Sequence, residues 1–150
     1  MDKTALFQKV INLTTSMHQV THELTKEVKS KAFSVTPVQY RIMEFIAVGQ
    51  PVTLSEICDC LDLSMPNASR ELRKLKEKDL CEKVVAVDDK RKHIIRLSEK
   101  GQNMMNAAFQ GIEARFLERI QHVSEEDLAQ IDFALDVLQS KVFYPAKPPQ

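Results

Sequence analysis

Two short helical segments joined by a three-residue break are the feature of this sequence that most constrains its fold. Thr53-Leu54-Ser55-Glu56 is a capping box that predicts a helix from about Leu54 to Leu61. Asp62-Leu63-Ser64 interrupts the pattern, and Ser64 is suited to cap a second helix that ends near Lys78. Two capped helices at this spacing predict a helix-turn-helix.

A β-hairpin is predicted directly after the second of these helices. The segment from Leu80 to Val87 and the run His93–Leu97 are both rich in residues that favour strands, and the charged segment Asp88–Lys92 separates them. This segment lacks the Asn-Gly or Asp-Gly of a tight two-residue turn, so the loop should be longer and project into solvent. The combination predicts a winged helix-turn-helix.

Helices with apolar stripes are predicted on both sides of this unit. Thr36-Pro37-Val38-Gln39 opens a helix that stops at Gly49-Gln50-Pro51. Ser98 and Ser124 are suited to cap two further helices. The stripes of the first and last helices, at steps of three and four, consist of Leu6, Val10, Leu13 and Met17, and of Leu128, Ile131, Leu135, Leu138 and Val142. The predicted fold class is mainly α with a small β-hairpin.

These terminal stripes carry more apolar surface than one small domain can cover, although a chain of 150 residues can bury one core. A symmetric partner would cover them, so we predict a homodimer. Residues 1–32 and 101–143 would form the helical dimerisation region, residues 33–100 the winged helix-turn-helix domain, and residues 144–150 an extended tail. The alternative is that the terminal helices fold back on their own domain.

Positive charge is concentrated in one quarter of the chain, although the net charge is zero. Residues 64–100 contain eleven Lys and Arg against seven Asp and Glu. A polyanion such as double-stranded DNA could be held there. Such an excess is also common on solvated surfaces, so charge alone does not identify the partner.

The second helix of the helix-turn-helix separates an apolar line, formed by Ala68, Leu72 and Leu75, from a polar face. The polar face suits a DNA major groove, where Arg pairs with guanine and Asn with adenine, and the first turn of such a helix usually reaches the bases. The predicted DNA contacts from this helix are Ser64, Pro66, Asn67, Ser69, Arg70, Arg73 and Lys74. The alternative is an ordinary solvated face, which Glu71 and Glu77 would fit.

Three consecutive cations stand at the tip of the predicted hairpin. Lys90, Arg91 and Lys92 repel one another, so they gain when a phosphate is near. Arg91 could enter a minor groove, with Asp89 holding its side chain in position. A soluble charged turn is the alternative. A basic hairpin tip beside a basic helix favours DNA over the rival function, a winged-helix protein–protein adaptor that does not bind DNA.

The same residues resemble the MarR family of regulators. Asp89–Gly101 is similar to the family's Asp-x-Arg stretch followed by Leu-(Thr/Ser)-x-x-Gly, and Leu63–Leu75 looks like its recognition helix. The resemblance implies a homodimer with interlocking terminal helices, recognition helices in successive major grooves and wings at the flanking minor grooves. It also implies a repressor of a pseudopalindromic operator, released by a small phenolic or lipophilic ligand or by an oxidant. By position, the groove-reading candidates are Asn67, Ser69, Arg70 and Arg73, and the wing pair is Asp89 with Arg91.

Metal binding and catalysis are not predicted, and no cofactor is expected. Cys58 and Cys60 diverge on a short helix, and with Cys81 they are interpreted as small buried residues, although a redox role stays open. The reactive Cys that the peroxide-sensing branch of the family has in its first helix is missing here. His18 and His22 share a helix face but lack a second pair. No phosphate loop, nucleophile elbow or metal-protease pattern suggests an enzyme. Without a membrane-length apolar run or a secretion leader, we expect a cytoplasmic protein.

Overall fold

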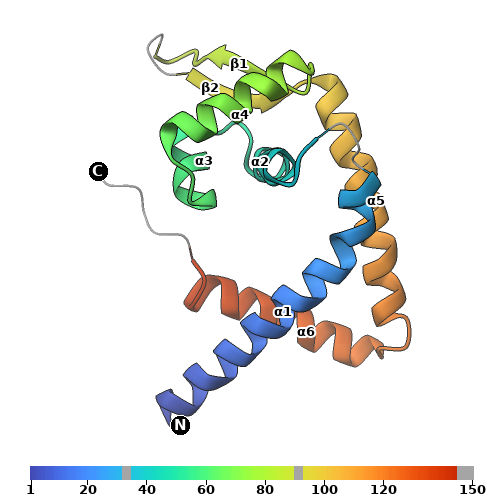
Figure 1. Cartoon of the computed structure of the whole chain (residues 1–150). Helices are drawn as coiled ribbons and strands as arrows, with labels where there is room; N and C mark the ends of the chain where they lie inside the picture. Colours follow the sequence, from blue (N-terminus) through green and yellow to red (C-terminus); the bar gives the residue numbers. More distant parts are fainter. Residues whose placement is uncertain (32–34, 90–92, 145–150) are drawn as a thin grey trace. The chain divides into compact units, whose positions relative to one another are not determined.

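The computed structural model describes residues 1–31, 35–89 and 93–144, and the elements follow the predicted order (Figure 1). The chain divides into two compact units, Met1–Arg115 and Phe116–Gln150. The helices and strands are α1 (Lys3–Lys31), α2 (Pro37–Gly49), α3 (Leu54–Leu61), α4 (Met65–Glu77), β1 (Cys81–Val85), β2 (His93–Leu97), α5 (Glu99–Ile120) and α6 (Glu125–Lys141). The predicted fold class, mainly α with a small hairpin, is confirmed.

Side-chain caps begin these helices where the sequence placed them. Thr36 and Gln39 form a complete capping box, in which the Thr36 side chain accepts from the Gln39 backbone N–H and the Gln39 side chain accepts from that of Thr36. The hydroxyls of Ser64 and Ser124 accept from the backbone N–H three residues later. Each cap satisfies a backbone donor that the first helical turn leaves unpaired.

The break between α3 and α4 is the turn of the helix-turn-helix. The Thr53 hydroxyl accepts from the Glu56 backbone N–H at the start of α3. Asp62 ends α3 in the left-handed region, with φ 53° and ψ 50°, and the Leu63 backbone N–H donates to the Cys58 carbonyl. The chain therefore reverses within three residues before Ser64 starts α4.

The hairpin pairs β1 and β2 antiparallel, with Cys81 opposite Leu97 and Val85 opposite His93. The expected first strand, Leu80 to Val87, was too long at both ends. Leu80 instead donates its backbone N–H to the Leu75 carbonyl and completes the end of α4. On its other edge β2 bridges to Val52, through two backbone hydrogen bonds between Val52 and Ile95.

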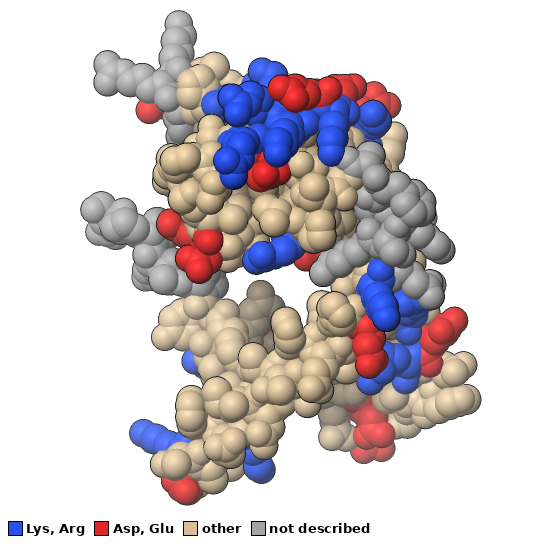
Figure 2. All heavy atoms as spheres, viewed as in Figure 1, with Lys and Arg blue, Asp and Glu red and all other residues tan. Residues whose placement is uncertain are grey.

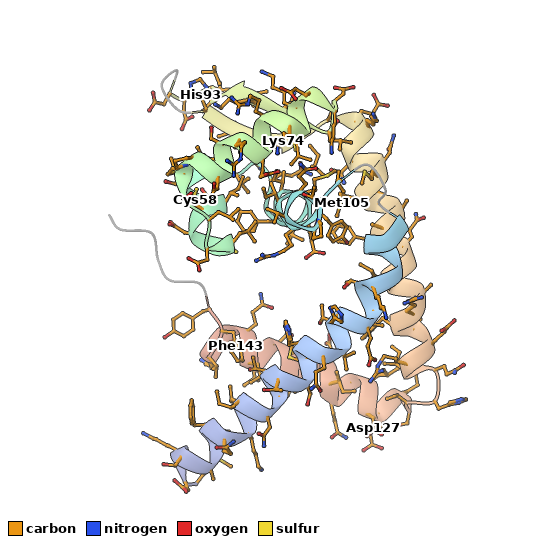
Figure 3. The ribbon with its side chains drawn as sticks, in the orientation of Figure 1. Cys58, Lys74, His93, Met105, Asp127 and Phe143 are labelled. Atoms are coloured by element: carbon orange, nitrogen blue, oxygen red, sulfur yellow. The ribbon has the colours of Figure 1, made fainter. Side chains whose placement is uncertain are left out.

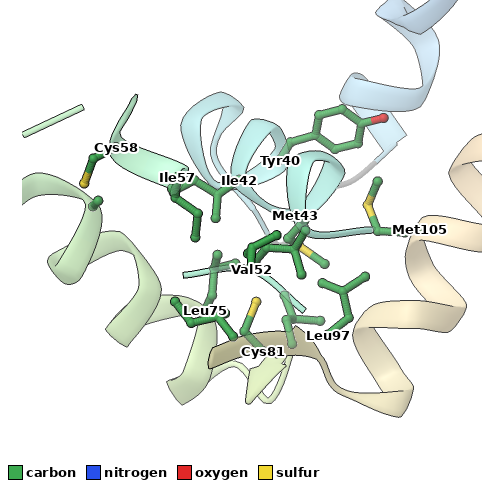
Figure 4. Close-up of a cluster of buried hydrophobic side chains, with 14 residues drawn as sticks. Tyr40, Ile42, Met43, Val52, Ile57, Cys58, Leu75, Cys81, Leu97 and Met105 are labelled. Atoms are coloured by element: carbon green, nitrogen blue, oxygen red, sulfur yellow. The ribbon is translucent and has the colours of Figure 1, made fainter. Parts of the chain in front are cut away.

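A single cluster of buried apolar side chains joins α2, α3, α4, the hairpin and the start of α5 (Figure 4). Ile42, Met43 and Ile46 of α2 are fully buried at its centre. Leu75 and Met105 reach the same cluster from α4 and α5. The helix-turn-helix and the wing thus share one core. Within this core, burial together with the nearby Glu44 carboxylate raises the pKa of Tyr40 to about 12.

Apolar side chains of the outer helices are exposed in the single chain. In unit Met1–Arg115, α1 exposes Leu6, Leu13 and Met17 of its predicted stripe, as well as Phe7 and Ile11. In unit Phe116–Gln150, no side chain of α6 is buried, and Leu135 is 57% exposed. These helices have amphipathic surface that the chain by itself does not cover.

The expectation that the cysteines are small buried residues was right for two of them and wrong for one. Cys58 and Cys81 are buried, but Cys60 is exposed. Cys60 lies two positions after Cys58 on the amphipathic helix α3, so its side chain falls on the solvent face when that of Cys58 faces inward. Burial raises the pKa of the Cys81 thiol to about 12.

Candidate nucleic-acid interface

Helix α4 is anchored by its apolar line and presents its polar face to solvent. Ala68 and Leu75 are fully buried, and Leu72 packs against the same core, as predicted from their spacing. Figure 3 shows Lys74 on this helix and Cys58 on the neighbouring α3. All seven predicted contact residues on this helix and its cap are exposed: Ser64, Pro66, Asn67, Ser69, Arg70, Arg73 and Lys74. One helix therefore carries a continuous polar surface on a rigid base.

Two of the four groove-reading candidates, Asn67 and Arg70, are hydrogen bonded to each other. A terminal nitrogen of Arg70 donates to Asn67 Oδ1 at 2.8 Å. The Nε of Arg70 lies 4.0 Å from Glu71 Oε1, and Lys74 Nζ lies 3.6 Å from the same oxygen. The Glu71 carboxylate therefore lies between two cations of the predicted contact face.

A buried glutamine from α2 holds Glu71 from the inner side. Gln39 Nε2 donates to Glu71 Oε2 at 2.9 Å, and Lys78 Nζ donates to Gln39 Oε1 at 2.9 Å. The hydrogen bond from Gln39 is the main cause that lowers the pKa of Glu71, and Lys74 and Arg70 act in the same direction. Glu71 is therefore ionised at neutral pH, and it is fixed to the core rather than free in solvent.

The surface over α4 is predominantly basic. Figure 2 shows Lys and Arg side chains gathered there, with Asp and Glu along one margin. A pocket of about 210 Å³ lies between α4 and the hairpin, and Ser69 and Arg73 are on its wall. The other residues that line it are Leu54, Leu72, Lys76, Cys81, Glu82, Lys83 and Ile95. Two predicted DNA contacts thus lie beside the wing, within unit Met1–Arg115.

The wing is described only up to the base of its tip. Asp89 is exposed, whereas Lys90, Arg91 and Lys92 lie outside the described residues. The predicted pairing of Asp89 with Arg91 therefore lies outside the described residues. On the body of the hairpin, Arg96 Nε donates to Glu82 Oε2 at 2.9 Å, so this cation is already engaged by a cross-strand carboxylate.

Comparison with known proteins finds one family model that matches the central part of the chain. Residues 33–92 match the model of the MarR family. Over these residues the chain is similar to the MarR family. This match covers both helices of the helix-turn-helix and the described residues of β1, and it supports a DNA-binding transcriptional regulator. No curated protein matches the chain.

Solved structures of MarR-type proteins share the fold at low sequence identity. A MarR family protein from Bacillus stearothermophilus is 16% identical, with 96% of this chain and 99% of that chain covered and a TM-score of 0.72. MarR of Staphylococcus aureus, solved with salicylate and kanamycin, is 22% identical, with 95% of each chain covered and a TM-score of 0.69. A mutant of MepR from the same organism, bound to an oligodeoxyribonucleotide, is 20% identical, with 87% and 97% covered and a TM-score of 0.57.

The Leu-Ser-x-x-Gly part of the MarR-type motif has a clear structural role in this chain. The Ser98 hydroxyl donates to the Asp79 carbonyl at 2.6 Å and accepts from the Gly101 backbone N–H at 2.9 Å. A Cβ on Gly101 would overlap the Leu80 carbonyl oxygen, so only glycine allows this approach. The motif therefore joins the end of α4 to the start of α5.

Sequence reasoning missed Gln39, Glu71 and Lys78 as parts of this surface. The sequence pattern predicts only that a helix begins at Thr36–Gln39, and it makes Glu71 compatible with an ordinary solvated face. No spacing rule links Gln39 to residues more than 30 positions later, so the tertiary contact became visible only in the structure.

The described residues show neither a metal-binding cluster nor a membrane-spanning helix. In residues 1–31, 35–89 and 93–144, no group of three or more His, Cys, Asp or Glu is placed to hold a metal ion. None of the helices in these segments is long and apolar enough to span a membrane.

Proposed function

We propose that this protein is a ligand-responsive repressor that binds a pseudopalindromic operator as a homodimer. The observation that carries the proposal is the polar face of α4, on which Asn67, Arg70 and Lys74 are exposed while Ala68 and Leu75 fix the helix to the core. A helix of this kind can enter the major groove, with Arg on guanine and Asn on adenine. The lysines and arginines of the wing would contact the flanking backbone and minor groove.

Dimerisation is proposed from the exposed apolar residues of α1 and α6. These residues include the predicted stripe members Leu6, Met17 and Leu135. Contiguous apolar faces of this kind usually mark a protein interface. A two-fold dimer would place two recognition helices at half-sites about one helical turn apart, roughly 10 bp.

Ligand response is proposed by analogy. The similar MarR from Staphylococcus aureus was solved with salicylate and kanamycin, and a similar MepR with ethidium bromide. For this chain we expect that a small aromatic ligand weakens the complex with DNA. Salicylate and ethidium are suitable first probes, measured by the anisotropy of a labelled operator duplex against glycerol as a control.

Selection of bound sequences from a random duplex library tests the proposal directly. An inverted repeat with half-sites roughly 10 bp apart would support it. Failure to enrich any sequence, together with binding to random duplex that does not weaken with salt, would favour the winged-helix adaptor instead. Sedimentation of the protein with the selected duplex then gives the number of chains bound to each site.

Substitutions distinguish base reading from backbone contact. Asn67→Ala and Arg70→Ala should each relax preference at particular base pairs by about 1–3 kcal/mol. Arg91→Ala should weaken binding to most sequences alike and reduce the salt dependence. Equal losses on selected and random duplex for Asn67→Ala and Arg70→Ala would contradict their assignment as base readers.

A further inference from the structure

Gln39 connects the first turn of α2 to two places on the recognition helix. Its side chain is buried, at 2% exposure for the residue, and its amide nitrogen donates to Glu71 in the middle of α4. Its amide oxygen accepts from Lys78 at the end of α4 and from the Thr36 backbone N–H. A helix that is held at two points along its length is fixed in its rotation about its own axis as well as in its position.

Glu71 extends this attachment from the buried side to the exposed side. One carboxylate oxygen, Oε2, accepts from Gln39, while the other, Oε1, lies 3.6 Å from Lys74 Nζ and 4.0 Å from Arg70 Nε. Arg70 in turn donates to Asn67 at 2.8 Å. A continuous chain of polar contacts therefore runs from the protein core to the first turn of α4.

We propose that Gln39 and Glu71 are positioning residues that fix the base-reading side chains before DNA arrives, and so determine how strongly the protein discriminates between sequences. The inference rests on the proposed function as a DNA-binding protein. It deepens that function because both residues would act through Asn67, Arg70 and Lys74, and not through contacts of their own with the duplex.

The physical reason is the entropy of long side chains. Arg and Lys lose rotamer freedom when they bind, and this loss lowers affinity unless their conformation is already fixed. A side chain held in one orientation also matches one base edge well and others poorly. Without the Glu71 carboxylate, Arg70 and Lys74 would be mobile cations, which favour the phosphate backbone of any sequence.

The test compares Glu71→Gln with Glu77→Gln. Both substitutions remove one negative charge from α4, and Glu77 is exposed on the same helix. Glu71→Gln keeps the shape of the side chain and its ability to accept from Gln39 but removes the charge that holds the two cations. We expect the ratio of affinities for selected and random duplex to fall about tenfold for Glu71→Gln and less than twofold for Glu77→Gln.

Gln39→Met provides a second variant that does not touch the exposed face. Methionine matches glutamine in length and cannot make the three hydrogen bonds. Discrimination should fall by a similar factor, and the double variant Gln39→Met with Glu71→Gln should lose no more than either single variant, since both break one chain of contacts. Thermal unfolding measured beside DNA binding separates loss of discrimination from loss of fold.

Two results would overturn the inference. One is an equal change in discrimination for Glu71→Gln and Glu77→Gln, which would show that only net charge matters. The other is a full discrimination ratio in folded Gln39→Met. Failure of the proposed function is distinguishable, because in that case the unmodified protein itself would show no preference for any duplex.

Discussion

Ile46 of α2 and Leu135 of α6 are both large apolar residues in helices, yet the first is fully buried and the second is 57% exposed. The helices around these two residues differ in burial in the same way. Side chains from α2, α3, α4 and the hairpin close one core, whereas α6 buries none of its residues. The closed region, from α2 to the start of α5, builds its core within the chain, whereas the open region, α6, buries no side chain. The two regions should therefore respond differently to mutation and to protein concentration.

Gly101→Ala is the substitution that we expect to destabilise the closed region most. The new Cβ would overlap the Leu80 carbonyl oxygen, which belongs to the backbone and cannot move without separating α4 from α5. We expect the free energy of unfolding to fall by about 3 kcal/mol or more, as measured by urea denaturation. Gly49→Ala is the control, because its Cβ would meet only Val52 Cγ1 at 3.4 Å. A loss below about 1 kcal/mol for Gly101→Ala would show that the junction is not tightly packed.

Leu135→Glu tests whether a second chain covers the exposed apolar face of α6. If a second chain covers this residue, the charge would be buried in the interface twice, once from each subunit. We expect dimer dissociation to increase about 150-fold, which corresponds to about 3 kcal/mol, in sedimentation equilibrium. Gln139→Glu adds the same charge at an exposed polar position of α6 and should change dissociation little. Identical dissociation constants for the two variants would mean that α6 is not part of the interface.

The closed region is also the part that the sequence predicted best. Thr36, Thr53 and Ser64 were predicted as caps, and each directly precedes the helix that it starts. The buried apolar line of α4 was predicted from the spacing of its residues. Such signals are local, so they can be recognised without the fold. The exposed face of α4 followed from the same periodicity.

The contacts that organise this face could not be predicted in the same way. Gln39 and Glu71 are 32 residues apart in the chain, and their hydrogen bond depends on how α2 crosses α4. The exposure of Cys60 was missed for a different reason, since three cysteines were given one common interpretation. The surface that would cover the apolar residues of α1 and α6 could not be predicted either, because a stripe indicates that a helix face favours burial without showing what buries it.

Ionisation of the buried Cys81 thiol should have a moderate effect on the stability of the closed region. Burial raises the pKa of this thiol to about 12 from its ordinary value of 9.0, so the folded protein keeps its proton when the unfolded chain has lost it. Stability should therefore be complete below pH 9 and fall by up to about 1.4 kcal/mol for each pH unit above it. Urea denaturation at pH 8 and pH 10 under reducing conditions measures the slope.

Cys81→Ala should remove this part of the slope, whatever its effect on stability at pH 8. Tyr40, whose pKa is also about 12, begins to contribute near pH 10 in both proteins and therefore cancels in the comparison. An unchanged slope in the variant would mean that the thiol is accessible to solvent in the folded state.

The smallest predicted effect in the closed region comes from the backbone conformation of Asp79. Asp79 follows the C-terminus of α4 with φ 58°, a left-handed conformation that glycine adopts without strain. Its carboxylate is also unfavourable beside the negative end of the helix dipole. We expect Asp79→Gly to raise the free energy of unfolding by about 0.5–1 kcal/mol. Asp88→Gly makes the same chemical change in the exposed wing segment, where φ is not positive, and should give no gain. Equal effects from the two variants would mean that loss of charge, and not relief of backbone strain at the end of the recognition helix, explains the result.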